Sequence, residues 1–389
     1  MPSPAAVPKT VFLGMSGGVD SSLSAVLLKE QGYNVVGVYM KNWSKDLPGM
    51  KCPWAEDLAD AKRVAVKLGI DFRVFDFETE YKQKVVDYML SEFKAGRTPN
   101  PDIMCNQEIK FKLFYETARE QGADLIATGH YARISPRPCL RKAADENKDQ
   151  TYFLYRISED ALAHTLFPIG DMLKKDVKKL AEEKGLDNAY KKESMGVCFV
   201  GEVGMEDFLK EYFEPNPGPI IEIETGHELG THEGAIFYTI GQRHGLDLGS
   251  ANKGADAGLP YYVVKKDITK NIVYVSRNLN AEDLWTTELD LEDIIKRTGD
   301  ALRGPAGSEP KASESDGRYN ATAPWDAEGR RPTGPVRIDV RLRHRAPLIP
   351  ATLEGNKLIF KKEIKRPAAG QSAVFYQGDA CIGGGIIKF

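Results

Sequence analysis

A glycine- and serine-rich run near the N-terminus has the residue types needed to hold phosphate. The run Gly14-Met-Ser-Gly-Gly-Val-Asp-Ser-Ser22 follows an apolar stretch and opens into helical spacing. Adjacent glycines let the backbone approach an anion, and serine hydroxyls with the free amides of a helix start bind phosphate oxygens. Asp20 is a candidate ligand for a magnesium ion that bridges those oxygens. The run lacks Gly-Lys-Ser/Thr, so a Walker A loop is not expected.

Two cysteines lie in settings that suit sulfur chemistry. Cys105 follows Asn100-Pro-Asp102 and is expected at or near a helix start, which lowers a thiol pKa. Asp102 is close enough in sequence to exchange a proton there. Cys198 lies between glycines in a basic segment. Singly, each cysteine is as consistent with a small buried side chain as with function. As a pair, they could move a sulfane sulfur by thiolate attack and end as a disulfide.

The other cysteines are expected to be structural. Cys52, Cys139 and Cys381 complete a set of five in 389 residues, with no Cys-x-x-Cys pair. This usage excludes a disulfide-stapled secreted domain and a zinc ribbon.

Short apolar runs alternate with helical segments over the first 130 residues. This alternation predicts a parallel sheet covered on both faces, with ligands beyond the carboxyl ends of its strands. The expected strands are 9–15, 34–40, 71–77 and 123–128, and the expected helices are 21–31, 55–68, 81–94 and 108–121.

The remaining chain changes character twice. A helical, basic stretch is followed after Pro215-Asn-Pro-Gly218 by short alternating runs typical of β structure. We therefore predict an α/β protein with an N-terminal parallel-sheet nucleotide domain at 1–150, a small central helical domain at 151–215 that carries Cys198 and binds RNA, and a C-terminal β-barrel-like domain at 216–389. Residues 298–334 are rich in Gly, Pro, Ser and charge, which is typical of a flexible insertion.

The net charge of -3 conceals basic segments. Residues 331–366 hold ten Lys or Arg against three acids, and residues 172–192 hold seven Lys against four acids. Two basic patches on separate domains suit a long folded RNA. A strand that carries Arg337, Arg341, Arg343 and Arg345 would point most of them to one face. No run approaches the ~18 apolar residues of a membrane span, so no membrane partner is expected.

The nucleotide run resembles the SGGxDS signature of the ATP pyrophosphatase (PP-loop) superfamily. Those enzymes split ATP between the α- and β-phosphates and adenylate a carbonyl oxygen. Further motifs make the chain similar, over essentially its whole length, to the tRNA-specific 2-thiouridylase family. The matching stretches are 14–22, 40–43, 95–103, 105–111, 127–132, 148–150, 194–201, 238–243 and 370–385.

The resemblance implies an ATP-dependent sulfurtransferase. ATP would adenylate O2 of the wobble uridine, in a subset of tRNAs such as those for Lys, Glu and Gln. Sulfur from a Cys198 persulfide would then replace that oxygen, and Cys105 would be the partner nucleophile that ends in a disulfide with Cys198. A base inside a duplex stack must be flipped out for such chemistry. An upstream sulfur donor or relay protein would load the persulfide.

The resemblance also assigns residues to each ligand. ATP would be held by Gly14, Met15, Ser16, Gly17, Gly18, Val19, Asp20 and Ser21, with Met40 and Gly129. The target base and tRNA would contact Asn100, Pro101, Asp102, Lys148, Asp149, Gln150, Arg343 and His344, where His344 replaces the family's tyrosine. Asp102, Cys105 and Cys198 are also a donor set for an iron–sulfur cluster, but the persulfide route is favoured over it.

Two other functions remain open from the sequence. A PP-loop synthetase or amidotransferase acting on a small metabolite would need neither Cys105 nor Cys198. A tRNA-binding module without catalysis would bind tRNA and turn over no ATP. Lys191-Lys-Glu-Ser-Met-Gly196 resembles the mitochondrial branch of the family, which implies a monomer in the mitochondrial matrix whose transit peptide is absent from this chain; the cytoplasm is the alternative.

Overall fold

The computed structural model describes residues 7–46, 52–136, 138–191, 204–248, 260–278, 284–297 and 335–388. Its N-terminal part is a five-stranded sheet in the order β3-β2-β1-β4-β7, and every neighbouring pair is parallel. The four long apolar runs form its first four strands, as the sequence predicts. The strands are β1 (Thr10–Gly14), β2 (Asn34–Lys41), β3 (Asp71–Asp76), β4 (Leu125–Thr128) and β7 (Thr165–Leu166).

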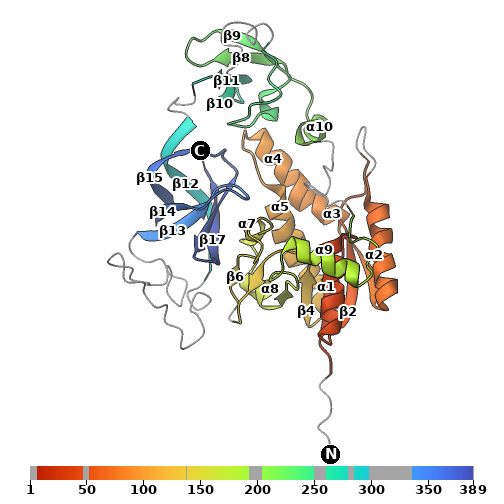
Figure 1. Ribbon diagram of the computed structural model, residues 1–389. Coiled ribbons are helices and arrows are strands. Elements are labelled where there is room, and N and C mark those ends of the chain that lie inside the picture. The colour runs from red at the N-terminus through yellow and green to blue at the C-terminus, as the bar shows by residue number, and fades with distance from the viewer. Residues whose placement is uncertain are drawn as a thin grey trace, which may run out of the picture.

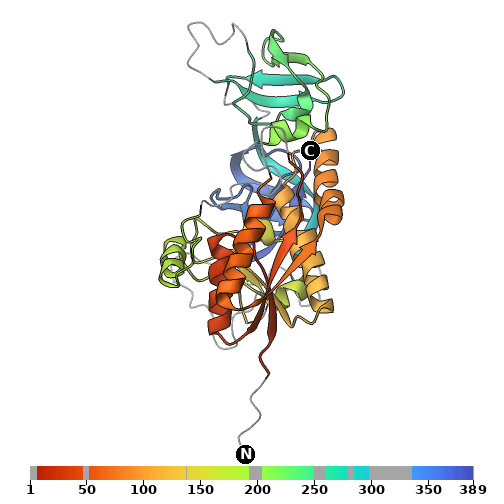
Figure 2. The same cartoon turned by 90° about the vertical axis from the view of Figure 1, so that its right-hand side faces the viewer.

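Helices cover both faces of this sheet, because its central strands β1 and β2 are apolar on both sides. In β1, Val11 and Leu13 enter one buried cluster with α1, α2 and α9, whereas Phe12 enters a second cluster with the α4 and α6 helices. Figure 2 shows the red α1 and the α2 helix on one side of the strands and lighter orange helices on the other. The helices are α1 (Val19–Glu30), α2 (Trp54–Leu68), α3 (Glu78–Tyr81), η1 (Lys82–Asp87), α4 (Tyr88–Lys94), α5 (Pro101–Met104), η2 (Cys105–Leu113), α6 (Phe114–Glu120), α7 (Thr151–Leu154), α8 (Glu159–Ala163) and α9 (Lys174–Glu183).

The strand order reverses between β1 and β4. From β1 the chain moves outward to β2 and β3, and it then returns to place β4 on the other side of β1. The helices that leave such neighbouring strands diverge, so a crevice opens at their carboxyl ends. The ends of β1 and β4 at Gly14 and Thr128 therefore mark where a ligand of this sheet is expected.

A small four-stranded sheet forms the upper part of the molecule in Figure 1. Its order is β10-β11-β8-β9, and β11 pairs with β8 in parallel, whereas the other two pairs are antiparallel. The helix α10 (Met205–Lys210) precedes it. The strands are β8 (Gly218–Glu222), β9 (Glu228–His232), β10 (Tyr262–Asp267) and β11 (Ile272–Ser276), with a 3-10 turn η3 (Ala235–Phe237).

Six antiparallel strands close into a barrel, drawn in cyan for β12 and in blue for the other five in Figure 1. Their order is β12-β15-β14-β13-β16-β17, and β12 pairs with β17 to close the ring. The short strands β5 (Arg133–Ile134) and β6 (Leu140–Arg141) extend it at β17. The barrel strands are β12 (Trp285–Lys296), β13 (Val336–Arg341), β14 (Ile349–Glu354), β15 (Lys357–Lys365), β16 (Ser372–Gln377) and β17 (Ala380–Ile387).

The barrel docks on the α7 region through buried polar contacts. The Tyr152 hydroxyl donates to the Ser372 carbonyl over 3.0 Å, and Tyr155 Oη lies 3.0 Å from Ser372 Oγ. A Cβ on Gly384 of β17 would lie 2.7 Å from a ring carbon of Tyr155, so the tyrosine ring packs directly on this glycine. The fully buried Arg297 donates to the carbonyls of Tyr155 and Ile157, at 3.3 and 3.1 Å. One side of the barrel thus shares a buried cluster with the α7 region.

The predicted fold class is confirmed, with a parallel-sheet domain followed by β structure. The three-part domain division stays a prediction; β7 joins the first sheet, and the strands after residue 216 form two sheets. The predicted arginine strand ends at Arg341, because the chain turns there and Arg345 takes a φ of 62°. Cys198 and the insertion at 298–334 lie outside the described residues. No helix in the described part of the chain is long and apolar enough to cross a membrane.

Candidate functional site

The glycine-rich run forms a tight loop between β1 and α1. The Ser16 amide donates to Ser21 Oγ over 3.3 Å, and Ser21 Oγ donates to the Gly18 carbonyl over 3.1 Å. Gly17 has a φ of 75°, which favours glycine. Gly18 is the N-cap of α1, and no side-chain hydrogen bond caps this helix start. The first amides of the 12-residue helix therefore have no side-chain cap and lie at a glycine-rich turn, which is an arrangement that binds phosphate.

Two residues distant in sequence pack against this loop, as the sequence predicts for the nucleotide pocket. A Cβ on Gly129 would lie 2.7 Å from the Ser21 amide nitrogen. A Cβ on Gly14 would lie 2.9 Å from the terminal methyl of Met40. Gly129 must therefore be a glycine for β4 to end against α1. The structure brings Met40, Gly129 and the loop together at the switch point of the sheet.

Asp20, in the first turn of α1, meets a buried lysine. Both carboxylate oxygens of Asp20 lie 2.8 Å from Lys174 Nζ, and the Tyr131 hydroxyl donates to Oδ1 over 2.9 Å. The Lys174 side chain is only 9% exposed. A magnesium ion on Asp20 would have to sit beside this ammonium group, so the carboxylate does not fit the predicted metal role. In the described ranges no group of three or more His, Cys, Asp or Glu could hold a metal.

Asn188 holds the loop from behind, and sequence reasoning missed it. Asn188 Nδ2 donates to the Gly17 carbonyl and to Ser22 Oγ, both over 2.8 Å. Lys191 nearby donates to Asp57 over 2.7 Å and also to Asp60 of α2. The chain that leads to Cys198 therefore departs from the nucleotide loop. The basic run at 191–192 was the only sequence signal for this anchor.

Cys105 lies one turn into a helix that starts at Pro101. Asn100 caps the helix, because its Oδ1 accepts the amides of Asp102 and Ile103 at 3.2 and 3.4 Å. Cys105 is 2% exposed and is the first residue of the π-helical segment η2. Such widened turns are rare and are often found at functional sites. The predicted helix start at Glu108 was too late, since Asn100-Pro101 forms a complete N-cap.

Asp102 lies beside Cys105 in the first helical turn. Burial raises the pKa of the Asp102 carboxyl, and the Lys110 ammonium opposes that rise. A carboxyl whose pKa is raised by burial can hold or release a proton closer to neutral pH. The proton-exchanging role of Asp102 stays a prediction.

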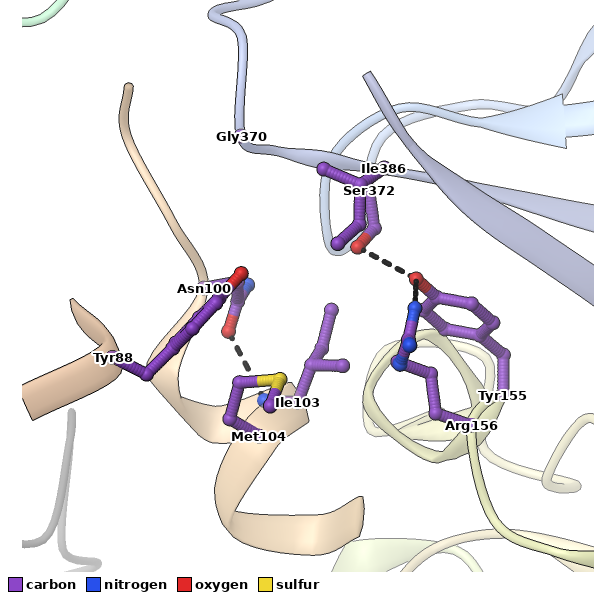
Figure 3. Close-up of a pocket in the computed structure, with 9 residues that line it drawn as sticks. All are labelled: Tyr88, Asn100, Ile103, Met104, Tyr155, Arg156, Gly370, Ser372 and Ile386. Carbon is purple, nitrogen blue, oxygen red and sulfur yellow. Dashed lines mark hydrogen bonds between the residues drawn. The ribbon is translucent and has the colours of Figure 1, made fainter. Parts of the chain in front are cut away.

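A pocket opens at the start of this helix, where it faces the barrel (Figure 3). Asn100 and Met104 come from the helix, Tyr155 and Arg156 from the end of α7, and Ser372 from β16. The Arg156 guanidinium donates to Tyr155 Oη over 3.4 Å and also to Gln107. The other lining residues are Tyr88, Ile103, Gly370 and Ile386.

In the run 148–150, which the resemblance places at the target base, Asp149 and Gln150 instead make contacts within the protein. Asp149 is 2% exposed and accepts from Arg341 over 2.8 Å and from the Thr151 hydroxyl over 2.9 Å. Gln150 Oε1 accepts the Tyr131 amide over 2.8 Å, and Lys148 is half-buried. Asp149 therefore joins the barrel to α7 rather than facing solvent, and Gln150 supports the tyrosine that bonds to Asp20.

The predicted tRNA pair Arg343–His344 lies in the turn after β13. Arg343 is exposed, as a phosphate contact requires, whereas His344 is half-buried. The His344 ring stacks on Phe153 with centroids 4.5 Å apart. Burial, followed by the nearby Arg345 guanidinium, lowers the pKa of His344 to about 4. His344 is thus neutral at pH 7 and contributes no positive charge to an RNA surface.

This histidine should make the fold acid-sensitive. Its unfolded pKa is about 6.5, so its contribution to stability is complete above about pH 6.5 and is lost as the pH falls toward 4. Because His344 is partly solvated, we expect a loss of about 2 kcal/mol. His344→Phe keeps the stacking on Phe153 and should flatten this part of the pH profile, measured by urea unfolding. The exposed His227→Phe should not, and equal profiles for wild type and His344→Phe would contradict the assignment.

Three segments of the chain match protein-family models. Residues 9–202 match a model described as the tRNA methyl transferase HUP domain. Residues 206–277 match a tRNA methyl transferase PRC-barrel domain, and residues 320–387 match an aminomethyltransferase beta-barrel domain. The three matches fall on the parallel sheet, the small sheet and the barrel.

Curated relatives match along nearly their full length. The tRNA-specific 2-thiouridylase MnmA of Proteus mirabilis is 44% identical, over 98% of this chain and 97% of its own. MnmA 2 of Geobacillus kaustophilus is 41% identical, over 97% and 94%. A solved 4-thiouridine synthetase–RNA complex with bound ATP aligns over 47% of this chain and 43% of its own, at 19% identity and a TM-score of 0.34. With these identities over nearly all of its length, the chain belongs to the tRNA-specific 2-thiouridylase family.

Proposed function

We propose that this protein uses ATP to convert uridine in tRNA to 2-thiouridine. The observation that carries the proposal is the uncapped start of α1 at the switch point of the sheet, in a chain of this family. A loop without the Walker lysine suits cleavage between the α- and β-phosphates, since nothing in it is built around the γ-phosphate. The rest of the proposal concerns the activation of the base and the delivery of the sulfur.

The first half-reaction makes O2 of uridine a leaving group. O2 attacks the α-phosphorus of ATP, pyrophosphate departs, and the base loses its N3 proton as the C2–O–AMP bond forms. The amides at the start of α1 would stabilise the negative charge on the phosphates in this step. Met40 and Gly129 would bound the nucleotide where they pack on the loop.

The second half-reaction replaces oxygen by sulfur. The terminal sulfur of a Cys198 persulfide attacks C2, and AMP leaves with the former O2. The Cys105 thiolate then attacks Cys198 Sγ, which forms a Cys105–Cys198 disulfide and releases the sulfur on the base. The sulfane sulfur is reduced while the two thiols are oxidised, so an external thiol must reduce the disulfide before the next cycle.

Several assignments belong to the same proposal. Asn100, Pro101 and Asp102 would meet the flipped wobble uridine of tRNAs such as those for Lys, Glu and Gln, with Arg343 on the phosphate backbone. A persulfide donor or relay protein would load Cys198, and the enzyme would act as a monomer in the mitochondrial matrix. The exposure of Arg343 and the position of Asn100 at a pocket support the assignment of these residues to tRNA.

The test uses the full chain with unmodified tRNA, ATP, magnesium and a persulfide donor. Nucleoside mass spectrometry should detect 2-thiouridine, and chromatography should detect AMP and pyrophosphate in equal amounts. ADP as the product would contradict cleavage at the α-phosphate. ATP consumption that does not need tRNA would favour a synthetase acting on a small metabolite, and tRNA binding without either product would favour a non-catalytic module.

A further inference from the structure

Thr98, two positions before Asn100, contacts the segment that leads into β16 and the segment that follows η3. The Thr98 amide donates to the Ala369 carbonyl over 2.7 Å, and Gln371 Nε2 donates to the Thr98 carbonyl over 2.7 Å. Both backbone groups of Thr98 are thus paired with the segment that enters the barrel strand β16. One of these bonds is between backbone groups and the other comes from a side chain, and together they join the segment before α5 to the segment before β16.

The contact requires the glycine at the start of the Gly370–Gly385 motif. Gly370 has a φ of 89°, which favours glycine, and a Cβ on it would lie 3.0 Å from two backbone atoms of Thr98. Gly370 and Asn100 also line the same pocket, as Figure 3 shows. The Gly-Gln pair at 370–371 therefore has a specific task, in which the glycine permits the approach and the glutamine donates the hydrogen bond.

The small sheet region holds the same segment from another side. Thr98 Oγ1 lies 3.3 Å from Thr239 Oγ1, in the Tyr238–Arg243 motif. Two residues earlier, a Cβ on Gly96 would lie 2.7 Å from a side-chain carbon of Ile268. A turn between α4 and α5 is thus enclosed by the barrel and by the region around β10.

The segment is also tied to α4 on its N-terminal side. Arg97 forms a two-pronged ion pair with Glu92, whose side chain is 10% exposed, and the Arg97 amide donates to the Glu92 carbonyl. On the other side, Asn100 caps the helix that carries Asp102 and Cys105. A shift of Thr98 would therefore move the cap, and with it the start of that helix.

We infer that Thr98 is the junction through which the barrel and the small sheet position the reacting segment Asn100–Cys105, with Gln371 and Thr239 as positioning residues. Neither residue needs to touch tRNA or ATP for this role. RNA that binds the barrel and the small sheet would then act on the orientation of Asn100 and Cys105 through these contacts. The inference rests on the proposed function, because the reaction is its main readout.

The test compares Gln371→Met with Gln377→Met, the same substitution at the exposed last residue of β16, the strand that Gln371 directly precedes. Gln371→Met should lower the single-turnover rate of thiolation about ten-fold at saturating tRNA and ATP, as expected for one hydrogen bond. The dissociation constants for tRNA and ATP should change less than about two-fold, since no binding group is removed. Hydrogen exchange of the Asp102 and Ile103 amides should become faster in Gln371→Met and should stay unchanged in Gln377→Met.

Thr239→Val is a second, nearly isosteric variant, in the segment that follows η3. It should lower the single-turnover rate of thiolation about three-fold. It serves if Gln371→Met does not fold. A wild-type enzyme that makes no 2-thiouridine would refute the proposed function. An active wild type with unchanged rates and unchanged exchange in both Gln371→Met and Thr239→Val would overturn the junction alone. Equal losses in Gln371→Met and Gln377→Met would also overturn it.

Discussion

Replacing Cys105 by serine should reduce 2-thiouridine formation at least about a thousand-fold, because a hydroxyl cannot resolve a disulfide bond to the base. ATP and tRNA should still bind, since Cys105 is buried and the change to serine replaces one atom. Single-turnover assays with mass spectrometry measure the loss. An intermediate in which the base stays joined to the protein through sulfur should accumulate, and a gel shift of labelled tRNA under non-reducing conditions would reveal it.

Cys139→Ala is the matched control for that experiment. Cys139 is as buried as Cys105, but it lies beside β6 in the barrel cluster. Burial raises the pKa of the Cys139 thiol, which keeps it protonated and unreactive. The control should therefore keep nearly full activity. If Cys105→Ser retained a tenth of the wild-type rate, or if Cys139→Ala lost as much, the nucleophile would have been wrongly assigned.

Replacing Lys174 by methionine should weaken ATP binding about a hundred-fold. The substitution leaves the Asp20 carboxylate without its ammonium partner in the first turn of α1, where the phosphates are expected. The Asp20 carboxylate is only partly solvated, with 30% of its side chain exposed, and its unpaired negative charge repels the triphosphate. Isothermal titration with ATP measures the change in dissociation constant.

A double substitution separates this charge effect from a general loss of structure. Asp20→Asn with Lys174→Met removes both charges and should recover at least about ten-fold of the lost affinity. Lys175→Met is the control on the same helix, because Lys175 is exposed. Losses that simply add in the double variant would show that Lys174 does not act through Asp20.

Most of the parallel sheet could be predicted from the sequence, for a physical reason. Strands buried on both faces are short, continuous apolar runs, and the residues 10–14 and 34–41 read that way. Several later strands do not. The strand β17 contains Gly383-Gly-Gly385, because close packing against β12 and Tyr155 leaves no room for side chains. Glycine has low strand preference, so pattern alone does not identify such a strand.

The candidate site divides in the same way. The nucleotide loop follows from sequence alone, since residue types, turn and helix start are contiguous between Gly14 and Ser22. The roles of Asp20 and Asp149 do not, because each carboxylate is decided by a partner far along the chain, Lys174 and Arg341. From the sequence, a charged residue next to a ligand-binding motif is predicted to be a ligand, and only the fold shows whether another residue already pairs with its charge.

The sequence by itself determined the family, the parallel sheet and the nucleotide loop, because each depends on local pattern or on motifs in a set order. Only the tertiary structure decided which charges are already paired, that His344 is neutral, and that Thr98 contacts the segments that lead into β16 and follow η3. Those properties depend on contacts across more than a hundred residues of chain, and no local periodicity encodes which distant backbone a Gly370 or a Gly129 must approach.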